Sequence, residues 1–249
     1  MTSAIDIENL TVRYHGKAVL DDVNVSVPAG AICGLVGMNG AGKSTLFKSI
    51  MNAVPVASGK VRLEGHTVKT AQKNGIVAYV PQTESVDWNF PVSVRDVVMM
   101  GRYGFMNILR RPSENDQELV NEALARVHLI DFEDRQVGQL SGGQRKRVFV
   151  ARALAQGATI LLLDEPFAGV DAKTEASLVG LLKDLQKQGI TTLVAAHDLA
   201  TIGSYCDHII LLKQAVIAAG RTKDVFTQKN IARTYDSVFG VKEGVPWMR

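Results

Sequence analysis

Residues 37–45 fit the pattern G-x-x-x-x-G-K-[ST], which is typical of a loop that holds nucleotide phosphates. Such a loop turns tightly so that several backbone N–H groups converge on the phosphates, and Gly40 and Gly42 permit the turn because they lack a Cβ. Lys43 is expected to reach the β- and γ-phosphates, and the Ser44 hydroxyl to bind Mg2+. The loop residues expected to contact nucleotide are Gly37, Asn39, Gly40, Ala41, Gly42, Lys43, Ser44 and Thr45.

The flanking segments have the periodicity that this function requires. The apolar run 31–36 predicts a buried strand, and residues 43–51 predict a helix whose N-terminus faces the phosphates. Further strands and helices alternate along the chain, which indicates an α/β fold with a mostly parallel sheet covered on both faces. Antiparallel strands are expected in 1–30 and 61–66, buried strands at 76–80, 159–163, 190–195 and 208–212, an edge strand at 216–219, and helices at 172–188 and 198–205.

Residues 83–155 interrupt this alternation with a mainly helical pattern. A polar, loop-rich stretch with a break at residues 110–112 comes first, and after it Ser113 and Asp116 have the spacing of a helix capping box. An apolar stripe at helical spacing follows, formed by Leu119, Val120, Ala123, Leu124 and Val127. We therefore expect one domain over 1–249, with a core formed by 1–82 and 156–220, a helical lobe at 83–155 and a short helical tail at 221–249.

Charge and composition exclude several classes of protein. The 28 basic and 25 acidic residues give a net charge of +3, which is too small to indicate a nucleic-acid partner. No apolar run approaches the roughly 20 residues that cross a bilayer, and the first residues do not resemble a signal peptide. Cys33 and Cys206 have no disulfide or metal-site spacing, so we expect a reducing cytoplasm. Any link to a membrane is expected to go through a partner.

Two carboxylates follow the apolar strand at 159–163. Asp164 is placed to hold Mg2+, which prefers oxygen ligands, and Glu165 to orient and deprotonate an attacking water. The alternative is a strand that ends in an ordinary acidic turn.

Residues 140–144, with the sequence LSGGQ, predict a second anion site at a helix start. One triphosphate does not need two helix N-termini from distant segments of one chain. A dimer would use both, by holding nucleotide between residues 37–45 of one copy and 140–144 of the other. The alternative is an ordinary glycine-rich loop before a helix.

In this order, the phosphate loop, Gln82, LSGGQ, the Asp-Glu pair, Asp171 and His197 resemble the ATP-binding subunits of ABC transporters over nearly the whole chain. The resemblance implies a P-loop NTPase core with an N-terminal antiparallel β subdomain and an inserted helical lobe. It implies that Tyr14 stacks on adenine, that Gln82 touches Mg2+, that Asp171 crosses a dimer interface and that His197 contacts the γ-phosphate. From the partner copy, the signature residues Ser141, Gly142, Gly143 and Gln144 would complete the nucleotide site.

Two departures from the family pattern, Met38 in the phosphate loop and the pair Gly169 and Val170 before Asp171, remove no functional side chain. For Tyr14, the residues alone leave open a strand position that faces the core.

The same resemblance implies an ATPase that uses ATP and Mg2+, in which Glu165, His197 and Lys43 are catalytic and Ser44, Gln82 and Asp164 surround the metal. It implies a head-to-tail dimer, separate membrane permease subunits and, through them, a substrate-binding protein. The chain is expected to be peripheral, on the cytoplasmic face of the inner membrane. ABC ATPases of DNA repair and translation are disfavoured, because no heptad insert and no second cassette is present.

Residues 86–94, together with Met100, Gly101 and Arg102, resemble the ATPase subunits of bacterial manganese, zinc and iron uptake systems. The alternative is that Trp88 and Phe90 only pack the helical lobe. Uptake of another small solute, or export, also stays open. The five histidines are scattered, so the transported ion is expected to be held by other subunits.

Overall fold

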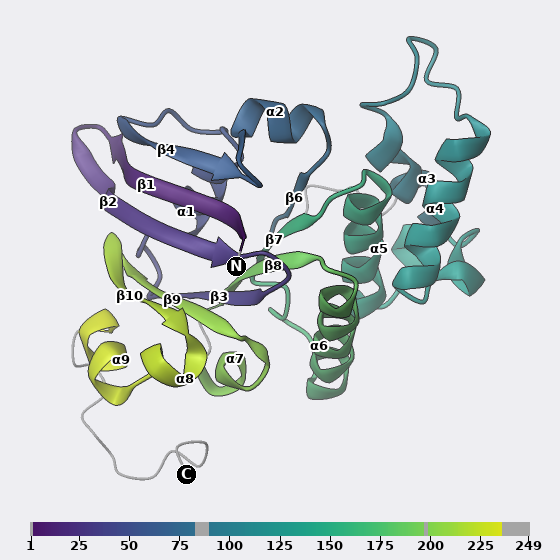
Figure 1. Ribbon diagram of the computed structural model, residues 1–249. Coiled ribbons are helices and arrows are strands. Elements are labelled where there is room, and N and C mark those ends of the chain that lie inside the picture. The colour runs from purple at the N-terminus through teal and green to yellow at the C-terminus, as the bar shows by residue number, and fades with distance from the viewer. Residues whose placement is uncertain (1, 83–89, 197–198, 236–249) are drawn as a thin grey trace.

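The computed structural model describes residues 2–82, 90–196 and 199–235. Two sheets and a group of helices make up this part of the chain (Figure 1). In chain order the first elements are β1 (Ser3–Tyr14), β2 (Lys17–Pro28), β3 (Ile32–Val36), α1 (Lys43–Ile50), β4 (Ser58–Leu63), β5 (His66–Thr67), α2 (Val68–Lys73) and β6 (Val77–Val80). Then come α3 (Val94–Met99), η1 (Met100–Arg102), α4 (Glu114–Arg126), η2 (Ile130–Phe132), η3 (Val137–Gln139), α5 (Gly142–Ala155) and β7 (Ile160–Asp164). The last are α6 (Ala172–Lys187), β8 (Thr191–Ala196), α7 (Leu199–Tyr205), β9 (His208–Lys213), β10 (Ala215–Arg221), α8 (Thr222–Val225) and α9 (Gln228–Thr234).

The central sheet has the strand order β10-β9-β3-β8-β7-β6. All its neighbouring strands are parallel except β10, which runs antiparallel to β9 at one edge. Because the carboxyl ends of parallel strands lie on the same edge of a sheet, the segments that follow β3, β6 and β7 emerge close together. Those segments are the phosphate loop, Gln82 and Glu165.

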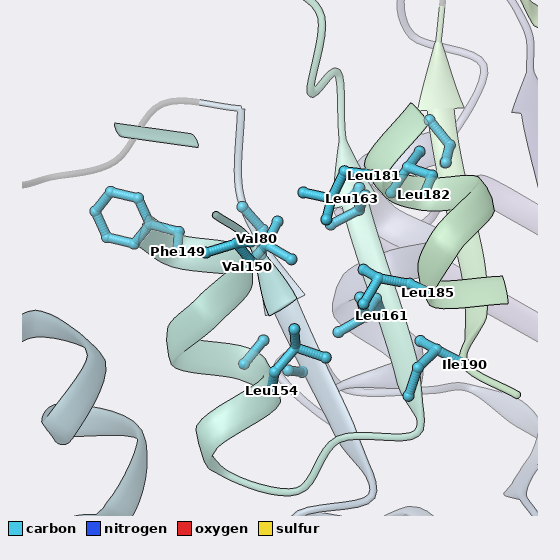
Figure 2. Packing of buried hydrophobic residues seen from close by; sticks show 14 of the residues in the cluster. Val80, Phe149, Val150, Leu154, Leu161, Leu163, Leu181, Leu182, Leu185 and Ile190 are labelled. Carbon is cyan, nitrogen blue, oxygen red and sulfur yellow. The ribbon is translucent and has the colours of Figure 1, made fainter. Parts of the chain in front are cut away.

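Alternate residues of the central strands supply two separate cores. On β7, Leu161 and Leu163 face one core and Ile160 and Leu162 face the other. Figure 2 shows the first core, in which β7 packs against α5 and α6. The labelled side chains around it are Val80, Phe149, Val150, Leu154, Leu181, Leu182, Leu185 and Ile190.

The second core lies between the central sheet and an antiparallel sheet of order β2-β1-β4-β5. Helix α1 contributes Leu46, Phe47 and Ile50 to this core, and all three are fully buried. The helix that begins at the phosphate loop is therefore anchored along its inner face, which fixes the position of its N-terminus.

Three helices of residues 90–155 begin with a capping box, in which an N-cap serine and the residue three positions later bond each other's backbone N–H. The pairs are Ser93 with Asp96 on α3, Ser113 with Asp116 on α4, and Ser141 with Gln144 on α5. The box predicted at Ser113 is confirmed. These helices pack on one another beside the edge strand β6 (Figure 1).

The expected α/β class is confirmed, and one local expectation needs adjustment. Strand β10, at Ala215–Arg221, is longer than the predicted 216–219. Residues 103–112 form an irregular loop before α4, in agreement with the loop-rich stretch and the break at 110–112 that the sequence predicts. That loop contains Gly104 and Pro112, and Arg110 has a φ of +47°, so a continuous helix is disfavoured. Of the predicted tail, α8 and α9 are helical, and residues 236–249 lie outside the described part. No helix within the described ranges has the length and apolarity needed to cross a membrane.

Candidate functional site

The phosphate loop joins β3 to α1 and requires glycine at two positions for steric reasons. A Cβ on Gly37 would lie 2.3 Å from the carbonyl oxygen of Leu212, which is backbone and has little freedom to move. Gly42 has a φ of +104°, and its Cβ would lie 2.7 Å from Leu20 Cδ2. The loop is therefore pressed against β9 and β2, and its course is fixed before any ligand binds.

Lys43 is held at the mouth of this loop. Its side-chain Nζ donates hydrogen bonds to the carbonyl oxygens of Gly37 (2.7 Å) and Met38 (3.2 Å), and the residue is only 7% exposed. Burial lowers the pKa of Lys43, while the charges of Glu165 and Asp164 act in the opposite direction. The ammonium group thus lies close enough to both carboxylates to interact with them.

A cavity of about 410 Å³ opens in front of this loop. It brings together residues from three distant segments, since Gln82 and Glu165 line it beside Lys43 and Ser44. Val19 of β2 also lines it, although no motif or spacing had pointed to that residue. The remaining lining residues are Met38, Asn39, Gly40, Gly42 and Thr45, all from the predicted loop.

The two consecutive carboxylates have different surroundings. Asp164 is 5% exposed, and its Oδ2 accepts a hydrogen bond of 3.0 Å from the hydroxyl of Tyr79. Glu165 has a φ of +48°, and its Oε2 accepts a bond of 2.6 Å from the side-chain Nε2 of Gln82. A non-glycine residue in the left-handed region is uncommon, and here it occurs where the strand ends and the cavity begins.

Tyr79 was assigned by the sequence only to a buried strand, so its role beside Asp164 was missed. Burial and the negative charge of Asp164 raise the pKa of Tyr79, which keeps the phenol protonated and able to donate. Its ring also packs edge-on against Phe47 of α1, with the centroids 5.9 Å apart. The available signal was a tyrosine inside an apolar strand, because a buried hydroxyl needs a partner.

The signature residues lie in a different part of the surface. Ser141 and Gly142 are exposed at the start of α5, whereas Gly143 is buried against Thr174 of α6. Thr174 donates both its backbone N–H and its hydroxyl to Asp171, the N-cap of α6. These hydrogen bonds lower the pKa of the exposed Asp171 carboxyl. Thr174 therefore connects the signature to Asp171.

Gln82 is common to two cavities. Besides the phosphate-loop cavity, it lines a second cavity of about 280 Å³ between α5, α6 and the ends of β6 and β7. Gly142 and Arg145 of α5 lie on that second cavity, and within the described chain no residue of 140–144 lines the first. Among the described residues that line these two cavities only Gln82 is shared, so it connects the phosphate-loop cavity with the start of α5.

Other predicted site residues are separate from the phosphate-loop cavity or cannot be placed. Tyr14 ends β1 and is 37% exposed, so it does not face the core, and it does not line that cavity. His197 lies outside the described residues, as do residues 83–89 with Trp88. Phe90 is described and is 62% exposed. Arg102 is buried and forms an ion pair with Asp116 inside the helical region.

Known proteins resemble this chain in sequence over most of its length. A family model described as "ABC transporter" matches residues 20–168. The "Manganese transport system ATP-binding protein MntA" of Synechocystis sp. (strain ATCC 27184 / PCC 6803 / Kazusa) is 52% identical over 93% of this chain and 89% of that protein. The "Chelated iron transport system membrane protein YfeB" of Yersinia pestis is 54% identical over 93% of this chain and 79% of that protein.

Solved structures agree in fold. The ADP conformation of MJ1267, described as an ATP-binding cassette of an ABC transporter, superposes with a TM-score of 0.85 at 25% identity. The superposition covers 95% of this chain and all of that one.

Proposed function

This chain belongs to the ABC transporter family, and we propose that it powers the import of a divalent metal ion, manganese, iron or zinc, through a separate membrane subunit. As a member of this family of ATPases, the chain binds and hydrolyses ATP. The observation that carries the role as a motor is the convergence of Lys43, Gln82 and Glu165 on one cavity in front of the phosphate loop, and the metal cargo rests on the similarity to metal transport components.

The donor set suits Mg2+ as the companion of ATP. The Ser44 hydroxyl, the Gln82 amide oxygen and the Asp164 carboxylate are all oxygen ligands, which a hard divalent cation prefers. Ser44 and Gln82 line the same cavity, and Asp164 directly precedes Glu165. When bound, Mg2+ would neutralise the charge that develops on the phosphate oxygens.

The residues of the chain act mainly by positioning. Lys43 exchanges its loop carbonyl partners for the β- and γ-phosphate oxygens, and the amides at the start of α1 hold the other oxygens. Glu165 orients the attacking water and accepts its proton, while Gln82 holds the Glu165 carboxylate in place. His197 is assigned to the γ-phosphate by its position in the family pattern.

The proposed working unit is a head-to-tail dimer. Residues 140–144 lie outside the lining of the phosphate-loop cavity in the described chain, although they form an exposed helix start with anion-binding character. Ser141 and Gly143 of a second copy would close the cavity over ATP, and Asp171 would lie at the same interface. Tyr14 would stack on the adenine.

The proposed partners are membrane permease subunits and, through them, a substrate-binding protein, with this chain peripheral on the cytoplasmic face of the membrane. The similarity to two relatives, a manganese and a chelated-iron transport component, supports a metal cargo. In this proposal the cargo ion is held by the other subunits.

The test is uptake of labelled manganese, zinc and iron into cells that carry the neighbouring membrane subunit and either this chain or its Glu165→Gln form. We expect uptake of one of these ions to be lost in the variant. Equal uptake of all three ions in both cells would reject the metal cargo and leave the ATPase assignment standing.

A further inference from the structure

The loop between η1 and α4 carries an apolar tip. The N–H of Arg110 donates a 2.9 Å hydrogen bond to the carbonyl of Asn107, which closes a four-residue turn. The two central residues are Ile108, which is 100% exposed, and Leu109, which is 71% exposed. Turn centres ordinarily carry Gly, Asn, Asp or Pro, so two adjacent aliphatic side chains at this corner are unusual. In Figure 1 the loop extends beyond the ends of α3 and α4.

The base of the loop is held firmly. Arg102 forms a buried ion pair with Asp116 (Nε to Oδ1, 2.9 Å) and donates to the carbonyl of Ala155 at 3.1 Å. Its guanidinium also lies 4.6 Å from the ring centroid of Phe105. The Phe105 ring packs over Gly75, where a Cβ would come within 2.7 Å of it. Ile108 and Leu109 therefore project from a loop whose first residues are held in place by these contacts.

Two positive charges follow the tip in the chain. Arg110 and Arg111 follow Leu109 directly, and both are exposed. The Arg110 guanidinium lies 5.3 Å from the ring centroid of Tyr103, which is itself 37% exposed. Aliphatic side chains followed by arginine and tyrosine are typical of protein segments that bind at a membrane surface. The aliphatic groups enter the region below the headgroups, and the arginines bind the anionic headgroups.

The tip is convex, which favours lipid over a protein partner. Residues 103–112 line neither of the two cavities described above, and Ile108 and Leu109 at the centre of the turn point their side chains into solvent. A bilayer surface accepts a protruding apolar tip without matching its shape, whereas a protein partner must supply a complementary pocket. We propose that Ile108 and Leu109 insert into the interfacial layer of a membrane containing anionic lipid, with Arg110 and Arg111 at the headgroup phosphates.

This contact goes beyond the proposed function, in which only protein partners link the chain to the membrane. It depends neither on the ion carried nor on ATP hydrolysis. Two aliphatic side chains and two arginines make a weak, reversible contact, since even a single acyl chain binds membranes only marginally. The loop would orient the chain at the membrane and would not anchor it by itself.

The first experiment places an environment-sensitive fluorophore at the tip. Cys33 and Cys206 are buried, so a thiol-reactive dye added to the full-length Ile108→Cys chain would label the new cysteine. We expect a blue shift and brighter emission with vesicles of phosphatidylcholine and phosphatidylglycerol, and a smaller change with phosphatidylcholine alone. Ile130→Cys is the matched control, because Ile130 is 47% exposed in η2, beyond the C-terminal end of α4, and its dye should not respond.

The second experiment measures co-sedimentation of the chain with the same vesicles. We expect Arg110→Gln/Arg111→Gln to weaken binding by about tenfold at low salt, and Ile108→Ser/Leu109→Ser to weaken it at least as much. ATP hydrolysis by these variants without lipid should be unchanged, which separates a lipid defect from misfolding and from failure of the ATPase assignment. Equal vesicle binding by all forms would overturn the proposal. So would a dye response that occurs only with the detergent-solubilised membrane subunit, because that result would assign the tip to a protein pocket.

Discussion

Adjacent carboxylates at the end of β7 have environments that suit different tasks. Asp164 is buried and its carboxylate accepts a hydrogen bond from the Tyr79 phenol, which holds it in one orientation and suits the proposed role beside Mg2+. Glu165 lines the phosphate-loop cavity, and its carboxylate accepts a hydrogen bond from the side-chain amide of Gln82. These different surroundings suit Asp164 to its proposed place beside Mg2+ and Glu165 to its proposed role as the base.

Tyr79→Phe tests the support of Asp164. The phenylalanine keeps the ring that packs on Phe47, so the fold should lose only about 1 kcal/mol, the typical value of one hydrogen bond. Without the donor to Oδ2, the Asp164 carboxylate is less well oriented. We expect the Mg2+ concentration for half-maximal ATPase activity to rise about three- to tenfold, with the rate largely restored at high Mg2+.

ATPase activity titrated against Mg2+ provides the measurement, and Tyr103→Phe is the control because it removes a phenol from the helical region. An unchanged Mg2+ dependence in Tyr79→Phe would show that Asp164 needs no such support.

At the scale of elements, the local parts of the fold could be predicted from the sequence and the long-range contacts could not. The phosphate loop, its flanking strand and helix, and the Ser113 capping box depend on residues close together in the chain, so their spacing carries the information. Tyr79 and Gln82 meet their carboxylate partners across more than 80 positions, and only the order of strands in the sheet brings them together. The break at 110–112 was likewise predicted from local residues, whereas the buried ion pair of Arg102 with Asp116 at the base of the loop is a contact that periodicity does not reveal.

The contact between α5 and α6 gives an element-scale prediction. A Cβ on Gly143 would lie 2.3 Å from Thr174 Cγ2, while Thr174 is fixed by two bonds to Asp171. Gly143→Ala should therefore push α5 from α6 or break the α6 cap, at a cost of about 1–3 kcal/mol, and lower ATPase activity.

The double variant Gly143→Ala/Thr174→Ser separates these effects. Serine lacks Cγ2 but keeps the hydroxyl that donates to Asp171, so it should recover most of the lost stability in thermal unfolding. If the double variant is no more stable than Gly143→Ala, the clash with Thr174 is not the cause.

At the scale of the whole molecule, the chain holds two proposed phosphate-binding devices, the phosphate loop and the LSGGQ segment, which lie on different cavities. The phosphate loop and Glu165 share one cavity, and Gly142 of the signature lies on the other, with Gln82 on both. This separation is the physical reason to expect a second copy, because neither device alone encloses a triphosphate.

Glu165→Gln should trap that closed dimer. The amide cannot accept the proton of the attacking water, but its size is similar and ATP binding should persist. On a sizing column with MgATP, we expect a dimer that is stable over the run and has no measurable turnover, whereas the unmodified chain hydrolyses ATP and elutes mainly as a monomer.

Two further variants test whether this dimer has the head-to-tail arrangement. Adding Lys43→Ala to Glu165→Gln should abolish the dimer by removing ATP binding. Adding Ser141→Arg should also abolish it while ATP binding to the monomer persists, because an arginine at the exposed start of α5 would block the approach of the other copy's phosphate loop. A dimer that forms equally well with Ser141→Arg would place the interface elsewhere on the molecule and would leave the LSGGQ segment with a role inside its own chain.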